Sequence, residues 1–137
     1  MRMVGFDTSV DIHRPVGQVF TYVANGEHGS AWNSAVQEVA PLTTVPAQKG
    51  SRYRMIRDLP IGRVENVYEI IEFVPDQVLT IQIVSGPNPF IYRYHFSEKG
   101  GVTTIALHGE VAPEGLHEVL GARGRLIPEA MLARLVK

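Results

Sequence analysis

Hydrophobic and polar residues alternate along most of the chain, which predicts a protein built mainly from β-strands. The first alternation runs from Val4 to His13, and its apolar face carries Phe6, Thr8, Val10 and Ile12. Successive side chains on a strand point to opposite faces, so this face should be buried and the face with Asp7 and Asp11 should meet water. The chain is therefore expected to open with a half-buried strand.

A helical period replaces the alternation after Pro15. Proline cannot donate a ladder hydrogen bond, so it ends the strand, and it suits the first turn of a helix. The apolar residues that follow recur at helical spacing and are Val16, Val19, Phe20 and Val23. This stripe predicts a helix that lies on the sheet and ends near Asn25. A second short helical turn is expected from Glu27 to Ala31, just before Trp32.

A second strand, a loop and a hairpin are expected in the middle of the chain. The strand should run from near Ser34 to Ala40, and the loop from Pro41 to Gly50. The segment from Ser51 to Phe73 should form a hairpin that turns at Pro60-Ile61, so the numbers of paired residues should sum to about 121. A slip of one residue would mix charged and aromatic side chains on one face, which supports this register.

The predicted register separates the hairpin into two faces. The concave face is aromatic and mostly apolar and should carry Tyr53, Met55, Arg57, Val64, Asn66 and Tyr68. The outer face is charged, with Arg52 opposite Glu69 as a cross-strand pair. We interpret the basic cluster of Arg52, Arg54 and Arg57 as part of a solvated sheet face paired with glutamates.

Two further strands are expected around a proline-rich turn. The strand from Val78 to Val84 should place Thr80 outward and should bury Leu79, Ile81 and Ile83. The turn from Gly86 to Pro89 should be stiff and should border the entrance of a cavity. The next strand has the cleanest alternation in the chain, with four aromatic residues on one face: Phe90, Tyr92, Tyr94 and Phe96.

The last hairpin is expected to turn at Lys99-Gly100, so the numbers of its paired residues should sum to about 199. The predicted pairs are Tyr94 with Ile105, Tyr92 with Leu107, and Phe90 with Gly109. Large residues would then face aliphatic or small ones, as a packed or cavity-lining face requires.

The C-terminal tail has a helical pattern, with apolar residues that begin at Leu116, Val119 and Leu120. Two glycines and a proline interrupt this pattern. Inside a helix they cost about 1 kcal/mol per glycine and about 3 kcal/mol for the proline. We therefore expect a C-terminal helix that covers the open sheet and breaks or kinks between Gly121 and Pro128.

The order of these motifs resembles a known superfamily. A strand, the segment H-R-P-V-G-Q-V-F-T-Y-V-A-N, a tryptophan and another strand resemble the opening of START-like, helix-grip proteins, in particular their polyketide cyclase/dehydrase-type (SRPBCC) branch. The likeness continues at three turns, V-P-D-Q-V-L from Val74, S-G-P from Ser85 and G-G-V-T-T from Gly100. It covers nearly the whole chain, and its motifs are structural.

The resemblance implies a single START-like ligand-binding domain over residues 1–137, with an α+β, helix-grip fold. Such a fold has a curved antiparallel sheet of about six or seven strands, two short N-terminal helices and a C-terminal helix over an internal cavity. In the family the C-terminal helix is continuous, so the glycines and the proline of this tail are a departure. A chain of 137 residues agrees with one domain and needs no disulfide for stability.

Composition and charge argue against several classes of protein. Thirteen basic and 14 acidic residues give a formal charge of −1, without the basic excess of a nucleic-acid-binding protein. The sequence has no cysteine, so it has no disulfide framework, and a reducing compartment, the cytoplasm, is the expected location. No signal peptide and no apolar run of about 18 residues is present, so we expect a protein without an integral membrane segment.

Motifs for metal binding and catalysis are weak. His95 should pair near Thr104, which would leave His108 roughly 13 Å further along. The two could then not share a zinc ion, whose bonds to nitrogen are about 2 Å long. The sequence contains no G-x-S-x-G elbow and no glycine-rich phosphate loop. We assign no catalytic residue, no metal and no cofactor.

A cavity that binds a small molecule is the favoured hypothesis. Four tyrosines and Asn66 on one face exceed what a dry core readily satisfies, although a fully filled core stays an alternative. The expected ligand is small and mostly apolar, whether aromatic, cyclic or lipid-like, with Arg57 and Asn66 as polar contacts. The predicted ligand-binding residues are Tyr53, Met55, Arg57, Asn66, Tyr68, Ile81, Phe90, Tyr92, Tyr94, Leu107, Leu116 and Leu120.

Two other classes of function stay open. The first is an enzyme resembling polyketide cyclases and aromatases, in which the pocket folds a reactive chain and a tyrosine or arginine assists proton transfer. The second is a regulatory domain that binds a partner through an exposed apolar patch. Apart from the small ligand, the one partner left open is a second copy of the chain in a homodimer.

Overall fold

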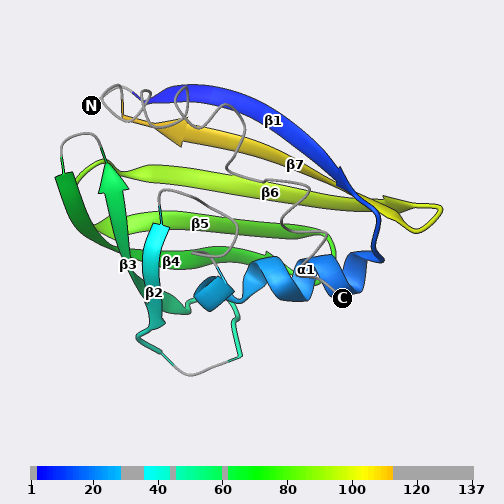
Figure 1. Cartoon of the computed structure of the whole chain (residues 1–137), viewed down its shortest axis with the longest axis horizontal. Helices are drawn as coiled ribbons and strands as arrows, with labels where there is room; N and C mark the ends of the chain where they lie inside the picture. Colours follow the sequence, from blue (N-terminus) through cyan, green and yellow to red (C-terminus); the bar gives the residue numbers. More distant parts are fainter. Residues whose placement is uncertain (1–2, 29–35, 44–45, 60–61, 113–137) are drawn as a thin grey trace.

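A curved antiparallel sheet dominates the computed structural model, which describes residues 3–28, 36–43, 46–59 and 62–112. Its strands are β1 (Val4–Ile12), β2 (Val36–Pro41), β3 (Arg52–Leu59), β4 (Gly62–Val74), β5 (Val78–Ser85), β6 (Phe90–Lys99) and β7 (Val102–Val111). They form one seven-stranded sheet in the order β1-β7-β6-β5-β4-β3-β2. Helix α1 (Val16–Ala24) and the 3-10 turn η1 (Gly26–His28) lie against its concave side (Figure 1). This architecture confirms the expected α+β, helix-grip fold.

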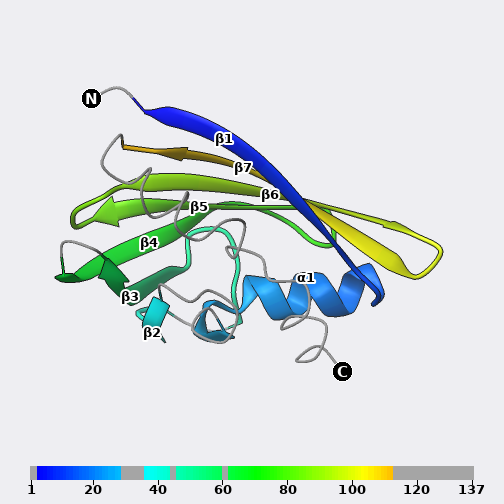
Figure 2. The same ribbon diagram turned by 45° about the horizontal axis from the view of Figure 1, so that its top comes forward.

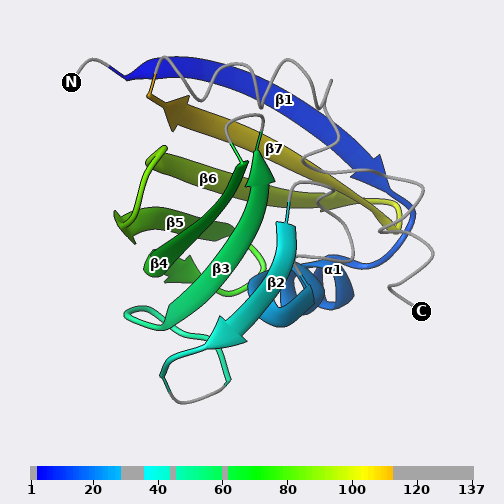
Figure 3. The same cartoon turned by 60° about the vertical axis from the view of Figure 1, so that its left-hand side comes forward.

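The sheet curls so strongly that its two edge strands, β1 and β2, approach α1 from opposite sides (Figure 3). A second view shows α1 crossing beneath the strands along the concave side (Figure 2). Apolar side chains from both layers fill the space between them, among them Phe20 of α1, whose ring contacts Phe73 and Phe96 edge-to-face at centroid distances of 5.3 and 5.0 Å. The core therefore sits inside the curl.

Helix α1 forms where the sequence predicts it. Pro15 takes the N-cap position, and Val19, Phe20 and Val23 of the apolar stripe are buried. The N–H of Val16 donates to the Glu98 carboxylate of β6 at 2.7 Å, so a negative charge lies at the positive end of the helix. The expected second helix is only the 3-10 turn in the described part of the chain.

The hairpin of β3 and β4 has the predicted register. Arg52 pairs with Glu69, Tyr53 with Tyr68, and the pairing continues to Leu59 with Gly62. Tyr53, Met55, Arg57, Asn66 and Tyr68 are buried on the concave side. On the outer face Arg52 and Arg54 form ion pairs with Glu69 and Glu65, each at 2.8 Å. The interpretation of the basic cluster as a solvated face is right for these two arginines and wrong for Arg57.

The hairpin of β6 and β7 differs from the prediction by two residues. Tyr94 pairs with Leu107, Tyr92 with Gly109 and Phe90 with Val111. The turn is centred on Gly100 and Gly101, which both have positive φ, instead of on Lys99-Gly100. Two successive residues of positive φ match the twist of a two-residue hairpin turn. A shift of two keeps every side chain on its predicted face, so the four aromatic residues are buried as expected.

Thr80 of β5 points outward as predicted and is nevertheless buried. Its hydroxyl donates to the Glu72 carboxylate, which also accepts a hydrogen bond from Arg93, so the two longer side chains cover it.

None of the helices in the described part of the chain is long and apolar enough to cross a membrane. Trp32 and the C-terminal helix with its expected break lie outside the described residues.

Candidate functional site: a cavity under the helix

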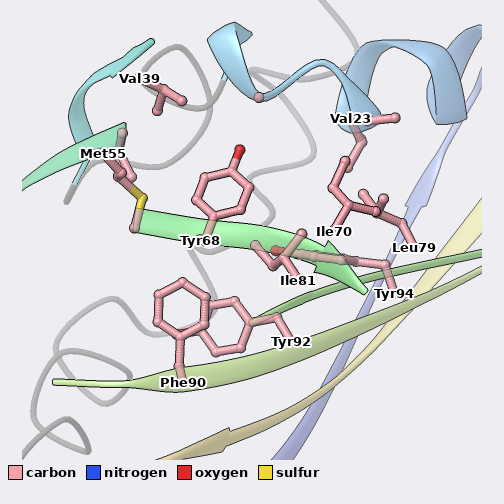
Figure 4. A pocket seen from close by; sticks show the side chains of 13 residues that line it. Val23, Val39, Met55, Tyr68, Ile70, Leu79, Ile81, Phe90, Tyr92 and Tyr94 are labelled. Carbon is pink, nitrogen blue, oxygen red and sulfur yellow. The ribbon is translucent and has the colours of Figure 1, made fainter. Parts of the chain in front are cut away.

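A cavity of about 50 Å³ lies between the concave face of the sheet and the C-terminal end of α1. Its helical side is formed by Val23, Ala24 and Gly26, and its edge by Val36 and Val39 of β2. The floor is formed by residues two apart on neighbouring strands, because alternate side chains of a strand share a face. These floor residues are Met55, Tyr68, Ile70, Leu79, Ile81, Phe90, Tyr92 and Tyr94 (Figure 4).

Stacked aromatic rings make up much of the floor. Phe90 and Tyr92 stack at a centroid distance of 4.0 Å, and Tyr68 stacks at 5.1 Å on Tyr53, which lies behind it on β3. Gly109 lies opposite Tyr92, and a Cβ atom there would collide with the ring of Phe6. The missing side chain lets Phe6 contact Tyr92 edge-to-face at 5.9 Å. The aromatic floor therefore depends on a glycine in the neighbouring strand.

The hydroxyls of the buried tyrosines are protonated near neutral pH, and burial raises their pKa further. The pKa of Tyr68 is raised far above 10, first by burial and then by the nearby Tyr53 and Tyr94 hydroxyls. Burial alone raises the pKa of Tyr94 in the same direction. For Tyr53 burial also raises the pKa, although the backbone of Gly26 partly offsets this effect. Near neutral pH the cavity therefore presents neutral hydroxyl groups.

Gly26 brings the turn η1 into contact with these tyrosines. A Cβ atom at residue 26 would collide with the hydroxyl of Tyr68 and would lie 3.0 Å from Cδ2 of Tyr53. Any larger residue would push η1 away from the sheet. The absence of a side chain at this position sets the height of the cavity above Tyr68.

Arg57 and Asn66 form a buried polar cluster at one end of the concave face. Arg57 is 2% exposed and its Nε and Nη2 donate to Oδ1 of Asn66 at 3.1 and 2.8 Å. Nη2 also donates to the carbonyl oxygen of Asn88 at 3.1 Å, and Nδ2 of Asn66 donates to that of Pro87 at 2.7 Å. The guanidinium carbon lies 5.2 Å from the centroid of Phe90, which lines the cavity. This cluster ties the turn between β5 and β6 to the floor.

A family model described as "Polyketide cyclase / dehydrase and lipid transport" matches residues 3–137. The chain belongs to this family. Among curated proteins, none is similar enough in sequence to count as a match. The family assignment confirms the resemblance inferred from the order of the motifs.

Solved structures share the fold of this polyketide cyclase/dehydrase family member at low sequence identity. A START superfamily protein from Mycobacterium smegmatis has a TM-score of 0.77 at 12% identity, with 96% of each chain covered. TTHA0849 from Thermus thermophilus has a TM-score of 0.76 at 15% identity, with 97% of each covered. The structure titled Ara h 8.0201 has a TM-score of 0.72 at 12% identity, with 98% of each covered. At such identities the likeness concerns the fold.

Half of the predicted site residues line the cavity. These are Met55, Tyr68, Ile81, Phe90, Tyr92 and Tyr94. Tyr53 lies behind Tyr68, and Arg57 and Asn66 form the polar cluster beside Phe90. Leu107 is buried opposite Tyr94 in the sheet and is not part of the cavity wall. Leu116 and Leu120 lie outside the described residues.

Other lining residues were not predicted, although some had a signal in the sequence. Val23 belongs to the apolar stripe of α1, Leu79 alternates with Ile81, and Ile70 continues the alternation of Tyr68. Each could have been included once the helix was placed over the floor. Gly26 had no such signal, because its role depends on a contact between segments distant in sequence.

A second hollow, of about 390 Å³, lies on the outer face near His95 and His108. The corrected register pairs His95 with Ala106, so His108 is only two residues further along β7, or about 7 Å. The predicted separation of these histidines was therefore too large. His108 instead pairs with Asp7 at 2.9 Å, and no three histidine or carboxylate groups among the described residues could hold a metal ion.

Proposed function

We propose that this single domain binds a small, mostly apolar molecule between α1 and the concave face of the sheet. The observation that supports this proposal is the cavity wall, whose described residues are apolar or aromatic and carry hydroxyls but no charge. Ligand sites commonly combine apolar walls with a few polar groups. The lack of cysteine keeps the cytoplasm as the expected location.

The ligand would have to widen the cavity. Sites for small molecules commonly occupy about 300–1,000 Å³, whereas this cavity has a volume of about 50 Å³. The N-terminal end of α1 is anchored to the sheet, because Val16 donates to Glu98 and Thr103 donates to the carbonyl oxygen of Arg14. At the other end η1 rests on Tyr53 and Tyr68 through Gly26. Separation of this end from the two rings would extend the cavity without release of the anchored end.

Catalysis is the second candidate, since the name of the family covers both cyclases and lipid transport. A cyclase of this kind would need a group that accepts or donates a proton in the pocket. The described cavity wall offers hydroxyls of raised pKa, Tyr68 and Tyr94, which are poor bases near neutral pH. We therefore propose binding as the function and leave a reaction as the alternative.

The binding of a neutral, environment-sensitive apolar dye tests this proposal. We expect micromolar affinity and a change of several-fold in Tyr92→Ala, because the variant loses one wall of the cavity. Arg52→Ala on the outer face is the matched control and should bind like the parent. If the parent binds no dye, or if folded Tyr92→Ala binds it like the parent, the cavity is not the binding site.

A further inference from the structure

The hydroxyl of Tyr68 is a buried polar group without a hydrogen bond to any of the described residues. Tyr68 is 6% exposed and lines the cavity. Its ring rises from β4 and its oxygen points across the cavity toward η1 (Figure 4). A buried hydroxyl that lacks a partner destabilises a protein, because it has lost its bonds to water. Such groups are rare in folded proteins and call for an explanation.

Gly26 of η1 packs directly against this hydroxyl. A Cβ atom at residue 26 would occupy the position next to the Tyr68 oxygen. Gly26 therefore lets η1 lie directly over the Tyr68 oxygen, and a ligand atom could take its place there once η1 moves away. Two observations from different elements meet at the same point: a hydroxyl on β4 that bonds to none of the described residues, and a missing side chain on η1.

The protonation state of the Tyr68 hydroxyl determines which ligand group it can bind. A tyrosine hydroxyl is neutral near pH 7 and burial raises the pKa of Tyr68 further, so the group can donate its proton in a hydrogen bond. None of the described residues of the cavity wall is charged, so an ionic group on the ligand would lose its hydration without compensation from them. The fitting partner is a neutral oxygen acceptor on an otherwise apolar molecule.

We propose that the Tyr68 hydroxyl is a specificity determinant that donates a hydrogen bond to a ketone, ester, ether or hydroxyl oxygen of a neutral apolar ligand. This inference rests on the proposed function and adds to it the polar part of the ligand. The ring systems of Phe90 and Tyr92 would contact the apolar part, since they form the floor beside Tyr68.

Two probes of nearly equal shape test this inference. 2-Acetylnaphthalene carries a carbonyl oxygen, and 2-isopropenylnaphthalene carries a CH₂ group in its place. Each is titrated as a competitor of a bound neutral dye against the parent, Tyr68→Phe and Tyr22→Phe. Tyr22 lies on α1, stacks on His28 and is not part of the cavity wall, so its variant removes a hydroxyl elsewhere.

The parent should bind the ketone about three to ten times more tightly than the hydrocarbon, as one hydrogen bond provides. Tyr68→Phe should remove this preference while it retains the affinity for the hydrocarbon, and Tyr22→Phe should retain the preference. Equal binding of both probes by the parent, or an unchanged preference in Tyr68→Phe, overturns the inference and leaves the proposed function standing. Failure of both probes to displace the dye from the parent also overturns the inference, whereas a parent that binds no dye overturns the proposed function as well.

Thermal unfolding provides a second readout that needs no ligand. The change of Tyr68 to phenylalanine keeps the ring and removes only a hydroxyl that bonds to none of the described residues, so the ligand-free variant should melt at the same temperature as the parent or a higher one. A clearly lower melting temperature would show that the hydroxyl already has a stabilising partner in the free protein, which contradicts the inference.

Discussion

Two arginines on β3 show how differently the two faces of the sheet use the same residue type. Arg57 on the concave face is 2% exposed and donates to Asn66 and to backbone carbonyls of the turn between β5 and β6. Arg52 on the outer face has a side chain that is 52% exposed and pairs with Glu69 at 2.8 Å. Arg57 joins the strands to the turn between β5 and β6 where little water is present. Arg52 only replaces hydrogen bonds to water with an ion pair that is itself solvated. Substitutions on the concave face should therefore change the stability of the protein more than substitutions on the outer face.

The largest loss of stability is expected for Arg57→Ala. It would leave Asn66 and the Asn88 carbonyl without their donor inside the protein and would create a void beside Phe90. The free energy of unfolding should fall by about 3 kcal/mol or more, measured by urea denaturation. Arg57→Lys keeps the charge but not the planar fork and should recover only part of the loss. A loss below about 1 kcal/mol would show that this end of the concave face is not a rigid cluster.

Gly26→Ala should have the next largest effect. The new methyl group would collide with Tyr68 and Tyr53 and force η1 away from the floor, at a cost of about 1–3 kcal/mol. Gly17→Ala is the matched control within α1, since the closest atom to its Cβ is Oδ1 of Asp76 at 4.0 Å. It should stabilise the helix by about 0.5–1 kcal/mol. Equal effects of the two substitutions would contradict the close contact at Gly26.

A smaller effect, visible only in acid, is expected for Glu72 on the outer face. Hydrogen bonds from Arg93 and Thr80 hold the pKa of its carboxyl below the ordinary value of 4.5. The unfolded chain therefore takes up this proton at a higher pH, so the stabilisation is present above pH 4.5 and is lost as the pH falls through the lower, folded value. Glu72→Gln should flatten the dependence of stability on pH below 4.5.

The control for Glu72 is Glu110→Gln, which removes a carboxylate that forms no ion pair with the described residues. Denaturation curves recorded across the acidic range should show a flatter pH dependence for Glu72→Gln than for Glu110→Gln. An identical slope for the two variants would mean that the hydrogen bonds of Glu72 do not form in solution.

The smallest effect is expected for Arg52→Ala and Glu69→Ala. Each should lower the free energy of unfolding by less than about 1 kcal/mol and leave dye binding unchanged, because an exposed cross-strand ion pair contributes little. Urea denaturation and dye titration check both values. A loss above about 2 kcal/mol would indicate that the outer face is covered, for example by a second copy of the chain.

The sequence predicts those parts of the fold that are set by residue patterns within one strand or one hairpin. The register of β3 and β4 follows from a charged and an aromatic set that only one pairing keeps apart, such as Arg52 with Glu69 and Tyr53 with Tyr68. The register of β6 and β7 depends on which glycines form the turn. Alternation cannot distinguish two registers that differ by two residues, so the choice of Lys99-Gly100 over Gly100-Gly101 left the faces right and the partners wrong.

The candidate site was predictable only in part for the same reason. Alternation identifies residues such as Tyr92 and Tyr94 as inward, but it does not separate those that line a cavity from those that fill the core, such as Leu107. That difference depends on where α1 crosses the sheet. Contacts between distant segments, such as Gly26 with Tyr68, or Arg57 with the turn after β5, have no pattern of their own in the sequence.

A methyl-resolved NMR titration with 2-acetylnaphthalene tests whether an apolar molecule enters the cavity on the concave face. The methyl signals of Met55, Ile70 and Ile81, which line the cavity, should shift in a saturable way. The methyl signals of Leu42 and Val84, which are exposed side chains, should stay in place. Shifts confined to Leu42 and Val84, with the cavity signals unchanged, would contradict the claim.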